Sequence, residues 1–170
     1  MALFSGNIED LKTLYNNQLR ALLSTENQIT QALPKMADAA TDSQLKQALQ
    51  THLKETQQHV QRLQQILGKL GGETGEKKCA VTAALISSGE DIIKSTKDPV
   101  VRDAGIIASA QKVEHFEMAS YGTARNWART LGFNDQAEML DKTLQEEGHA
   151  DHLLTSISDR MNPQATSRAA

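Results

Sequence analysis

The stretch 98–132, DPVVRDAGIIASAQKVEHFEMASYGTARNWARTLG, carries both ends of a long helix and an ordered row of side chains between them. Asp98 suits an N-cap, and Pro99 suits the first helical position, where its missing N–H would have no partner. Gly132 is a typical residue to end a helix. Steps of three and four residues align one face, which consists of Ile107, Gln111, Glu114, Met118 and Tyr121. An acid therefore stands on the face that should enter the core.

Three other leucine-rich segments have the same periodicity. One begins with Asn7 as the expected N-cap and continues to about Ala39, and Pro34 within it should bend or shorten the helix. The second begins near residue 41 or 42 and ends at the glycines of 68–72. The third extends from residue 134 or 135 until shortly before Pro163.

The connections between these segments predict their arrangement. Short turns join the first pair and the last pair of helices, so the helices within each pair should be antiparallel. A long connection, 71–98, joins the two pairs and contains an apolar segment, 80–93, that should form a short helix. We therefore predict an all-α protein, a ferritin-like four-helix up-down bundle with a long crossover connection containing a short extra helix. Residues 1–161 should form this single domain, and residues 162–170 a disordered C-terminal tail.

The composition is that of an ordinary soluble protein, with 39% hydrophobic and 23% charged residues. A net charge of -3 with scattered basic residues argues against nucleic acid as a main partner. No apolar run is long enough to span a membrane, and the first residues, MALFSGNIEDLK, lack the pattern of a signal peptide. Cys79 is the only cysteine, which suits a reducing compartment. We therefore expect a cytoplasmic protein that does not associate with membranes.

Acidic and imidazole side chains occur at matched positions on the four long helices. The set consists of Glu26, Glu55, His59, Glu114, Glu117, Glu147 and Asp151. Glu26 and Glu55 are equally far from the first turn, and the four acids of the second hairpin form two pairs that are level about Gly132. Each pair should lie roughly 20–28 Å from its turn at the rise of an α-helix. Both hairpins can therefore contribute to one layer.

Charged side chains on core-facing stripes are costly to bury unless they pair or bind a metal ion. Two adjacent iron or manganese ions need several carboxylates to neutralise them, and one or two imidazoles complete the shell. Glu55 stands on the edge of its stripe, and His59 fits a metal ligand and a hydrogen-bonded core imidazole equally well. His52 and His115 are expected to orient carboxylates or fill space.

At these residues the chain resembles the ferritin-like superfamily, in which one Glu is followed by a Glu with a nearby His and the pattern repeats in the second hairpin. More closely, it resembles the YciE/YciF-type bacterial proteins, a stress-associated ferritin-like family. The resemblance rests on TENQITQALPKMADAA (25–40), HLKETQQHVQRL (52–63), VRDAGIIASAQKVEHFEMASYGT (101–123) and TLQEEGHADHLLT (143–155).

The resemblance implies a homodimer with a di-iron centre. Its ligands would be Glu26, Glu55, Glu114 and Glu147, with His59, Glu117 and Asp151 as additional candidates. The pattern departs from the common one in two places, because His59 follows Glu55 by four residues rather than three and Asp151 stands where rubrerythrin-like members have His. We expect a di-metal protein, with iron or manganese, that reacts with oxygen or peroxide during stress. The alternative is a non-enzymatic structural or interaction helical-bundle homodimer.

Overall fold

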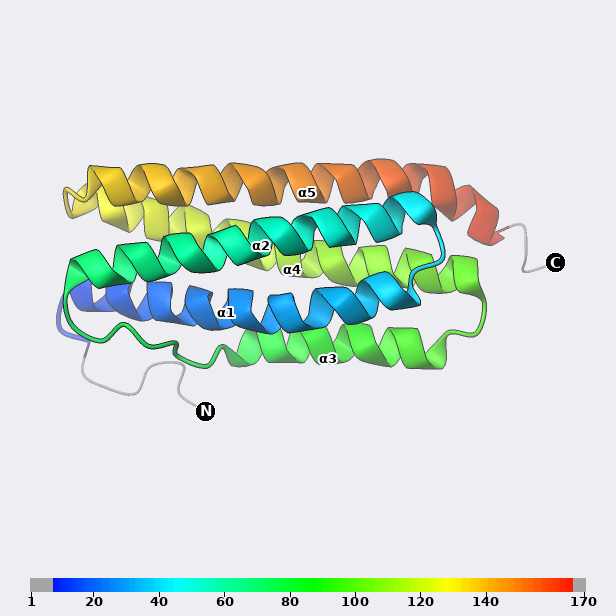
Figure 1. The fold of residues 1–170 in the computed structure, drawn as a ribbon, viewed down its shortest axis with the longest axis horizontal. Helices are drawn as coiled ribbons and strands as arrows, with labels where there is room; N and C mark the ends of the chain where they lie inside the picture. The colour runs from blue at the N-terminus through cyan, green and yellow to red at the C-terminus, as the bar shows by residue number, and fades with distance from the viewer. Residues whose placement is uncertain (1–7, 167–170) are drawn as a thin grey trace.

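Two long helical hairpins lie side by side, with a shorter helix along one edge (Figure 1). The computed structural model describes residues 8–166, and this range contains five α-helices and no β-strand. The helices are α1 (Leu11–Ala39), α2 (Ser43–Leu70), α3 (Ala80–Ser95), α4 (Pro99–Thr130) and α5 (Asn134–Thr166). The prediction of an all-α protein with an extra helix between the hairpins is thus confirmed.

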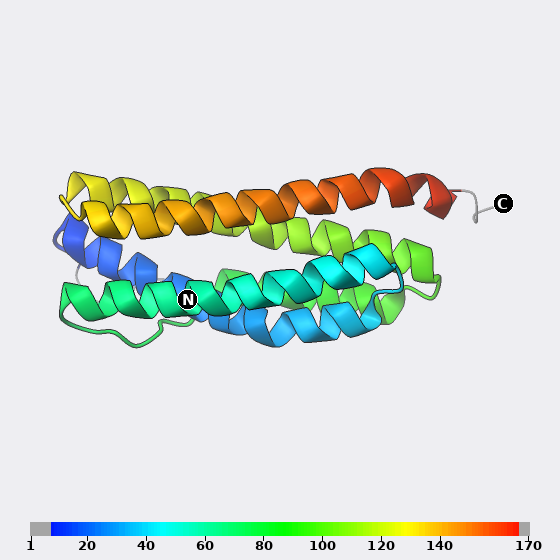
Figure 2. The same cartoon turned by 45° about the horizontal axis from the view of Figure 1, so that its top comes forward.

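The two hairpins pack so that every neighbouring pair of long helices is antiparallel. α1 pairs with α2 and α4 with α5, while α1 also contacts α4 and α2 contacts α5 (Figures 1 and 2). α3 packs against α4 and α1. This contact is close, because a Cβ atom on Gly105 of α4 would clash with Cγ2 of Ile92 on α3. Within the described range, no helix is long and apolar enough to cross a lipid bilayer.

Aspartate side chains begin three of the long helices. Asp10, Asp42 and Asp98 are the N-caps of α1, α2 and α4, and each carboxylate accepts hydrogen bonds from backbone N–H groups of the first turn. The expected cap at Asn7 is therefore replaced by Asp10, and Asn7 lies outside the described residues. Pro34 does not shorten α1, which continues to its end at residue 39.

The C-terminal helix is longer than predicted. α5 continues through Pro163 to Thr166, so the part of the expected disordered tail that spans 162–166 is helical, and residues 167–170 lie outside the described range. Ile157 and Met161 are buried in the core and hold this end of the helix against its neighbours. Arg160 also donates to both carboxylate oxygens of Asp42, at 2.9 and 2.8 Å.

A buried aspartate of α4 fixes the turn between α1 and α2. Asp103 exposes 1% of its surface and accepts hydrogen bonds from the backbone N–H of Thr41, the hydroxyl of Thr41 and the backbone N–H of Asp42, at 2.6 to 2.9 Å. These donors would otherwise be left without partners at the end of a helix. The first hairpin is thereby tied to the second.

The apolar core is divided into two clusters along the length of the long helices. One cluster includes Tyr15, Leu19, Leu63, Tyr121 and Leu140, and the other includes Ile29, Leu45, Ile107, Leu154 and Ile157. On α1, Glu26 stands between Leu22 of the first cluster and Ile29 of the second. On α5, Glu147 likewise stands between Leu140 and Leu154. A polar layer therefore separates two apolar halves.

Candidate metal centre

The polar layer is assembled from all four long helices. Its buried members are Glu26 from α1, His52 and His59 from α2, Glu114 and Glu117 from α4, and Glu147 from α5. Except for His52, these are residues that the sequence placed in the candidate site. These residues lie at the same height because they are about equally far from the turns of the two hairpins. Each acid also lies on the face that its helix turns toward the core.

The ligand atoms of this layer form two overlapping groups, within each of which the atoms lie within 4.8 Å of one another. The first group consists of His52, Glu114, Glu117 and Glu147, and the second consists of Glu26, His59 and Glu147. Glu147 belongs to both groups and has two carboxylate oxygens. One carboxylate can therefore contribute to two neighbouring cation positions.

His59 lies between carboxylates on both sides of its ring. Its Nδ1 atom is 3.0 Å from Oε1 of Glu147 and 3.5 Å from Oε1 of Glu26, and its Nε2 atom is 3.0 Å from Oε2 of Glu146. Glu146 in turn accepts hydrogen bonds from Arg62. The outer nitrogen of His59 is thus held by a carboxylate, which fixes the ring and leaves Nδ1 facing the layer.

His52 repeats this arrangement one heptad earlier on α2. Its Nε2 atom lies 3.4 Å from Oε1 of Glu114 and 3.7 Å from Oε2 of Glu147, while its Nδ1 atom lies 3.6 Å from Oε2 of Glu55. Glu55 is half-buried and belongs to neither group. In the structure, the imidazole of His52 reaches into the layer and Glu55 stands behind it.

Asp151 is also outside both groups. Its Oδ1 atom accepts a hydrogen bond of 3.1 Å from Gln111 and lies 3.3 Å from Nε2 of His115. One helical turn beyond Glu147, this carboxylate reaches the polar side of α4 rather than the layer. The structure thus brings together Glu26, His59, Glu114, Glu117 and Glu147 and leaves Glu55 and Asp151 beside them.

Many polar atoms of the layer have no hydrogen bond within the described residues. These atoms are Oε2 of Glu26, Nδ1 of His52, Nδ1 of His59, Oε2 of Glu114, and both oxygens of Glu117 and of Glu147. Buried polar groups in folded proteins nearly always have partners. Apart from Nδ1 of His52, which faces Glu55, these oxygens and nitrogens converge from different helices, which is the arrangement of ligands around a cation. The residues present therefore fit a metal ion.

The pKa values of the buried acids and of His59 show that the layer is electrostatically unfavourable without a cation. Burial, together with the charges of neighbouring carboxylates, raises the pKa of Glu117 and of Glu147, and raises that of Glu114 although His52 opposes it. For His59, burial alone would lower the pKa, but Glu147 and Glu26 outweigh it and raise the pKa to about 10. Protons or metal ions must therefore neutralise the layer.

The pKa values of the two carboxylates outside the layer shift in the opposite direction. Burial raises the pKa of Glu146, but Arg62 outweighs burial and lowers it. The His52 imidazole lowers the pKa of Glu55. Both stay ionised and can hold the outer nitrogen of a histidine. Tyr121, which is completely buried, donates a hydrogen bond to Oε1 of Glu26. The inner acids are thus supported by a second set of polar side chains.

Carboxylate oxygens with a minority of imidazole nitrogens suit iron or manganese, and the absence of thiolate donors in the layer does not favour copper(I). Sequence reasoning assigned His52 a supporting role and did not single out Glu146 or Arg62. A heptad pattern along α2 would have placed both histidines on the buried face. Its positions are Leu45, Leu49, His52, Thr56, His59, Leu63 and Ile66. Nothing in the sequence distinguishes Glu146 from a surface acid.

Known proteins match this chain over nearly all of the residues that the structure describes. A family model described as a domain of unknown function (DUF892) matches residues 10–167. Protein YciF of Escherichia coli strain K12 is 36% identical over 165 residues, a match that spans 96% of this chain and 99% of YciF.

Solved structures show the same arrangement of helices. The E. coli stress protein YciF aligns with a TM-score of 0.88 at 36% identity and covers 92% of this chain and 99% of its own. YcfI from Rhodopseudomonas palustris, which has been proposed to be a structural protein, aligns with a TM-score of 0.86 at 40% identity over 89% of this chain and 97% of its own. A protein from Xanthomonas campestris pv. campestris shares the fold alone, with a TM-score of 0.78 at 21% identity over 94% of this chain and 99% of its own.

Proposed function

The chain belongs to the YciF-like family described as a domain of unknown function (DUF892), and we propose that it is a ferritin-like protein that holds two iron or manganese ions in its buried layer. The observation that carries this proposal is the position of Glu147, whose carboxylate is shared by two groups of ligand atoms. The unpartnered atoms of Glu117 and Glu114 support it. The long helices α1, α2, α4 and α5 would then constitute a ferritin-like four-helix bundle, with α3 in the crossover connection.

The proposed roles follow from the positions of the side chains. Glu114, Glu117 and His52 would hold one ion, Glu26 and His59 the other, and Glu147 both. Such ions would supply Lewis-acid and redox chemistry toward dioxygen or peroxide. The apolar clusters on either side exclude bulk water, which strengthens every electrostatic interaction within the layer.

Outside the ligands, two contacts keep the site in shape. Glu146 holds the outer nitrogen of His59 at 3.0 Å, so that its inner nitrogen faces the carboxylates. Tyr121 fixes one oxygen of Glu26 by donating a hydrogen bond to it and leaves the other oxygen without a partner.

We further propose that the protein acts in the cytoplasm, as a homodimer, during a stress response. The last point is supported by the similarity to the E. coli stress protein.

Metal analysis tests the proposal directly. Protein purified without chelator and reconstituted with iron(II) or manganese(II) should contain about two ions per chain. The double variant Glu114→Ala/Glu147→Ala should lose them, whereas Asp91→Ala/Glu138→Ala, which removes two exposed acids, should retain them. Equal metal in the two double variants would contradict the proposal. X-ray absorption at the iron and manganese edges then identifies the metal.

A structural or interaction homodimer without turnover is the second candidate function. It is favoured by the similarity to YcfI of R. palustris, which has been proposed to be a structural protein, and by the half-buried position of Glu55, which lies outside both groups of ligand atoms. Oxygen consumption and peroxide loss on addition of ferrous iron separate the two candidates. A metal-dependent oxidase consumes one of the two, and a structural protein consumes neither. Light scattering gives the oligomeric state in both cases.

A further inference from the structure

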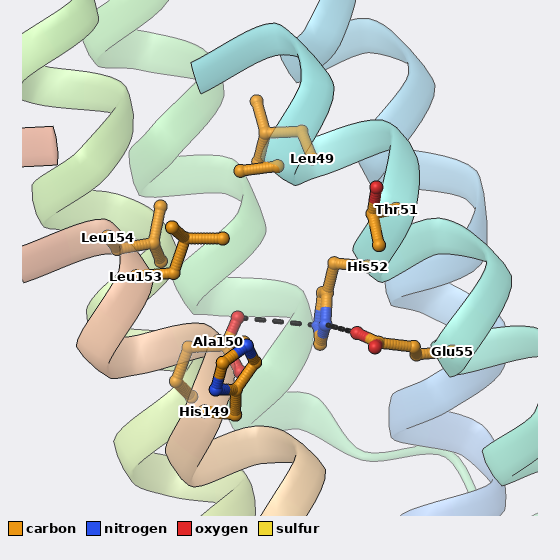
Figure 3. Close-up of a pocket in the computed structure, with 10 residues that line it drawn as sticks. Leu49, Thr51, His52, Glu55, His149, Ala150, Leu153 and Leu154 are labelled. Atoms are coloured by element: carbon orange, nitrogen blue, oxygen red, sulfur yellow. Dashed lines mark ion pairs between the residues drawn. The ribbon is translucent and has the colours of Figure 1, made fainter. Parts of the chain in front are cut away.

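A small pocket between α2 and α5 ends on the polar layer. Its volume is about 70 Å³, and Figure 3 shows its lining side chains around His52. The walls are mainly apolar and include Ala48, Leu49, Ala150 and Leu154. Of its other lining residues, His52 and Glu114 are buried, whereas Thr51 and His149 are exposed. The buried pair therefore forms the inner end, and the exposed pair marks the mouth.

The pocket has a wider cleft outside it. The cleft, of about 400 Å³, extends along the same two helices toward Arg160. Ala48, Thr51 and Leu153 line both spaces. The pocket and the cleft therefore adjoin, and the wide cleft at the protein surface leads to the small pocket at the layer. Two further pockets, one between α1, α3 and α4 and one between α1 and α3, contain no residue of the layer.

The size of the inner pocket limits what can occupy it. An apolar cavity that binds benzene has a volume of roughly 150 Å³, and pockets for drug-sized ligands have about 300–1,000 Å³. At about 70 Å³, this pocket is too small for either. It can accommodate a molecule of only a few heavy atoms, or a few waters.

The chemistry of the lining side chains further limits which molecules the pocket can hold. The carboxylate of Glu55 at the wall repels anions, and the apolar side chains on the walls do not solvate cations. At the inner end, Oε2 of Glu114 has no hydrogen bond within the described residues. His52 lies beside it, with Nε2 3.4 Å from Oε1 of Glu114 and Nδ1 facing Glu55. Both side chains are more than nine-tenths buried. A buried carboxylate oxygen without a partner therefore stands where the pocket meets the layer.

We propose that this pocket is the access route and binding place for a small uncharged molecule, of the size of dioxygen or hydrogen peroxide, at the His52 and Glu114 side of the layer. The inference rests on the proposed metal centre, because it names the class of molecule that the centre would meet. It also assigns the two halves of the layer different roles. The half with His52 and Glu114 is open to such a molecule, whereas the half with Glu26 and His59 does not line the pocket.

Filling the pocket from its apolar walls tests the proposal without touching the layer. Ala150→Leu extends a side chain into the space from α5, and Ala48→Leu does so from α2. Ala32→Leu is the matched control, because Ala32 is buried to the same degree as Ala150, at 7% and 9% exposure, and lines a pocket between α1 and α3. Circular dichroism verifies that all three fold.

The first measurement needs no metal. Crystals of the chelator-treated protein are pressurised with xenon, which enters apolar cavities of this kind. We expect a xenon peak beside Ala150 in the unaltered protein and in Ala32→Leu, and none in Ala150→Leu or Ala48→Leu. Absence of xenon from the pocket of the unaltered protein would overturn the proposal.

The second measurement uses nitric oxide, an uncharged diatomic molecule, as the probe. It is mixed with protein loaded with ferrous iron, and its binding is followed optically. Binding should be slower by about tenfold or more in Ala150→Leu and Ala48→Leu, with an unchanged iron content, and within about twofold of the unaltered rate in Ala32→Leu. Unchanged rates in both pocket-filling variants would overturn the access route and leave the metal centre intact. A protein that binds neither iron nor manganese would refute the proposed function, and the xenon result would still decide the pocket.

Discussion

The Oε1 atom of Glu147 lies 3.0 Å from the Nδ1 atom of His59, and both side chains are completely buried. Neither atom has a hydrogen bond of good geometry within the described residues, so the pair is close without being satisfied. The second oxygen of Glu147 lies 3.7 Å from Nε2 of His52 on the other side. A single carboxylate thus stands between two imidazoles of one helix, and this relationship links the halves of the candidate site.

Replacing Glu117 by Gln should have opposite effects on the metal-free and metal-loaded protein. Its carboxyl is completely buried with both oxygens unpartnered, and burial raises its pKa well above the ordinary value of 4.5. The folded metal-free protein therefore disfavours the charged form of this group, which lowers its stability relative to the unfolded chain. Glu117→Gln removes the ionisable group and should raise the free energy of unfolding in chelator by on the order of 1 kcal/mol.

With manganese or iron present, the same variant should be less stable than the unaltered protein because a ligand is lost. Urea unfolding with and without chelator measures both effects. Glu138→Gln, an exposed change on α5, should alter neither. If Glu117→Gln is not more stable in chelator, the carboxyl is not held in the unfavourable environment described above.

The metal-free protein should lose stability as the pH rises above neutrality. The pKa of His59 is raised from 6.5 to about 10, so the folded state holds a proton that the unfolded state releases. This contribution to stability is fully present below pH 6.5 and is lost as the pH rises toward 10. Its size is on the order of a few kcal/mol. Unfolding in chelator across this range measures it.

The control for this prediction is a second histidine of the same protein. His59→Asn should flatten the pH dependence, while His152→Asn, at an exposed position of α5, should leave it unchanged. An equal slope in both variants would show that other groups are responsible.

Glu146→Gln should weaken metal binding although Glu146 belongs to neither ligand group. Its carboxylate holds Nε2 of His59 at 3.0 Å and is itself held by Arg62. Loss of such an outer carboxylate typically lowers metal affinity about 10–100-fold. Competition titrations with manganese(II) or iron(II) measure the change, with Glu138→Gln as the control on the same helix. An affinity equal to that of the control would mean that Glu146 does not orient the histidine.

Asp103→Ala should be among the most destabilising single changes outside the polar layer. It leaves two backbone N–H groups and the hydroxyl of Thr41 without their acceptor at the turn between α1 and α2. The expected loss is about 2–4 kcal/mol in the free energy of unfolding. Urea denaturation measures it, and Asp91→Ala on α3 should change stability by less than about 0.5 kcal/mol. A small effect of Asp103→Ala would indicate that water replaces the carboxylate.

The sequence by itself determined where the helices lie and which faces they bury. Caps such as Asp98 and stop glycines such as Gly132 act within one helical turn, and leucine periodicity reports a face directly. The level positions of Glu26, Glu114, Glu117 and Glu147 were predictable because α-helices rise by a constant amount per residue. The end of α5 was not, because the burial of Met161 outweighs the helix-breaking tendency of Pro163.

Only the tertiary structure decided how near Glu55 comes to the layer. The heptad steps of α2 place His52 and His59 on its buried face, but Glu55 lies at the margin of that face, and a small rotation of α2 against α5 would move it toward the layer or away from it. That rotation is set by how Leu45, Leu49, Leu63 and Ile66 pack against three other helices, which is a property of all four surfaces together. The partners of Glu146, Asp103 and Asp151 come from distant parts of the chain for the same reason. Periodicity along one helix carries no information about the side chain that another helix places opposite it.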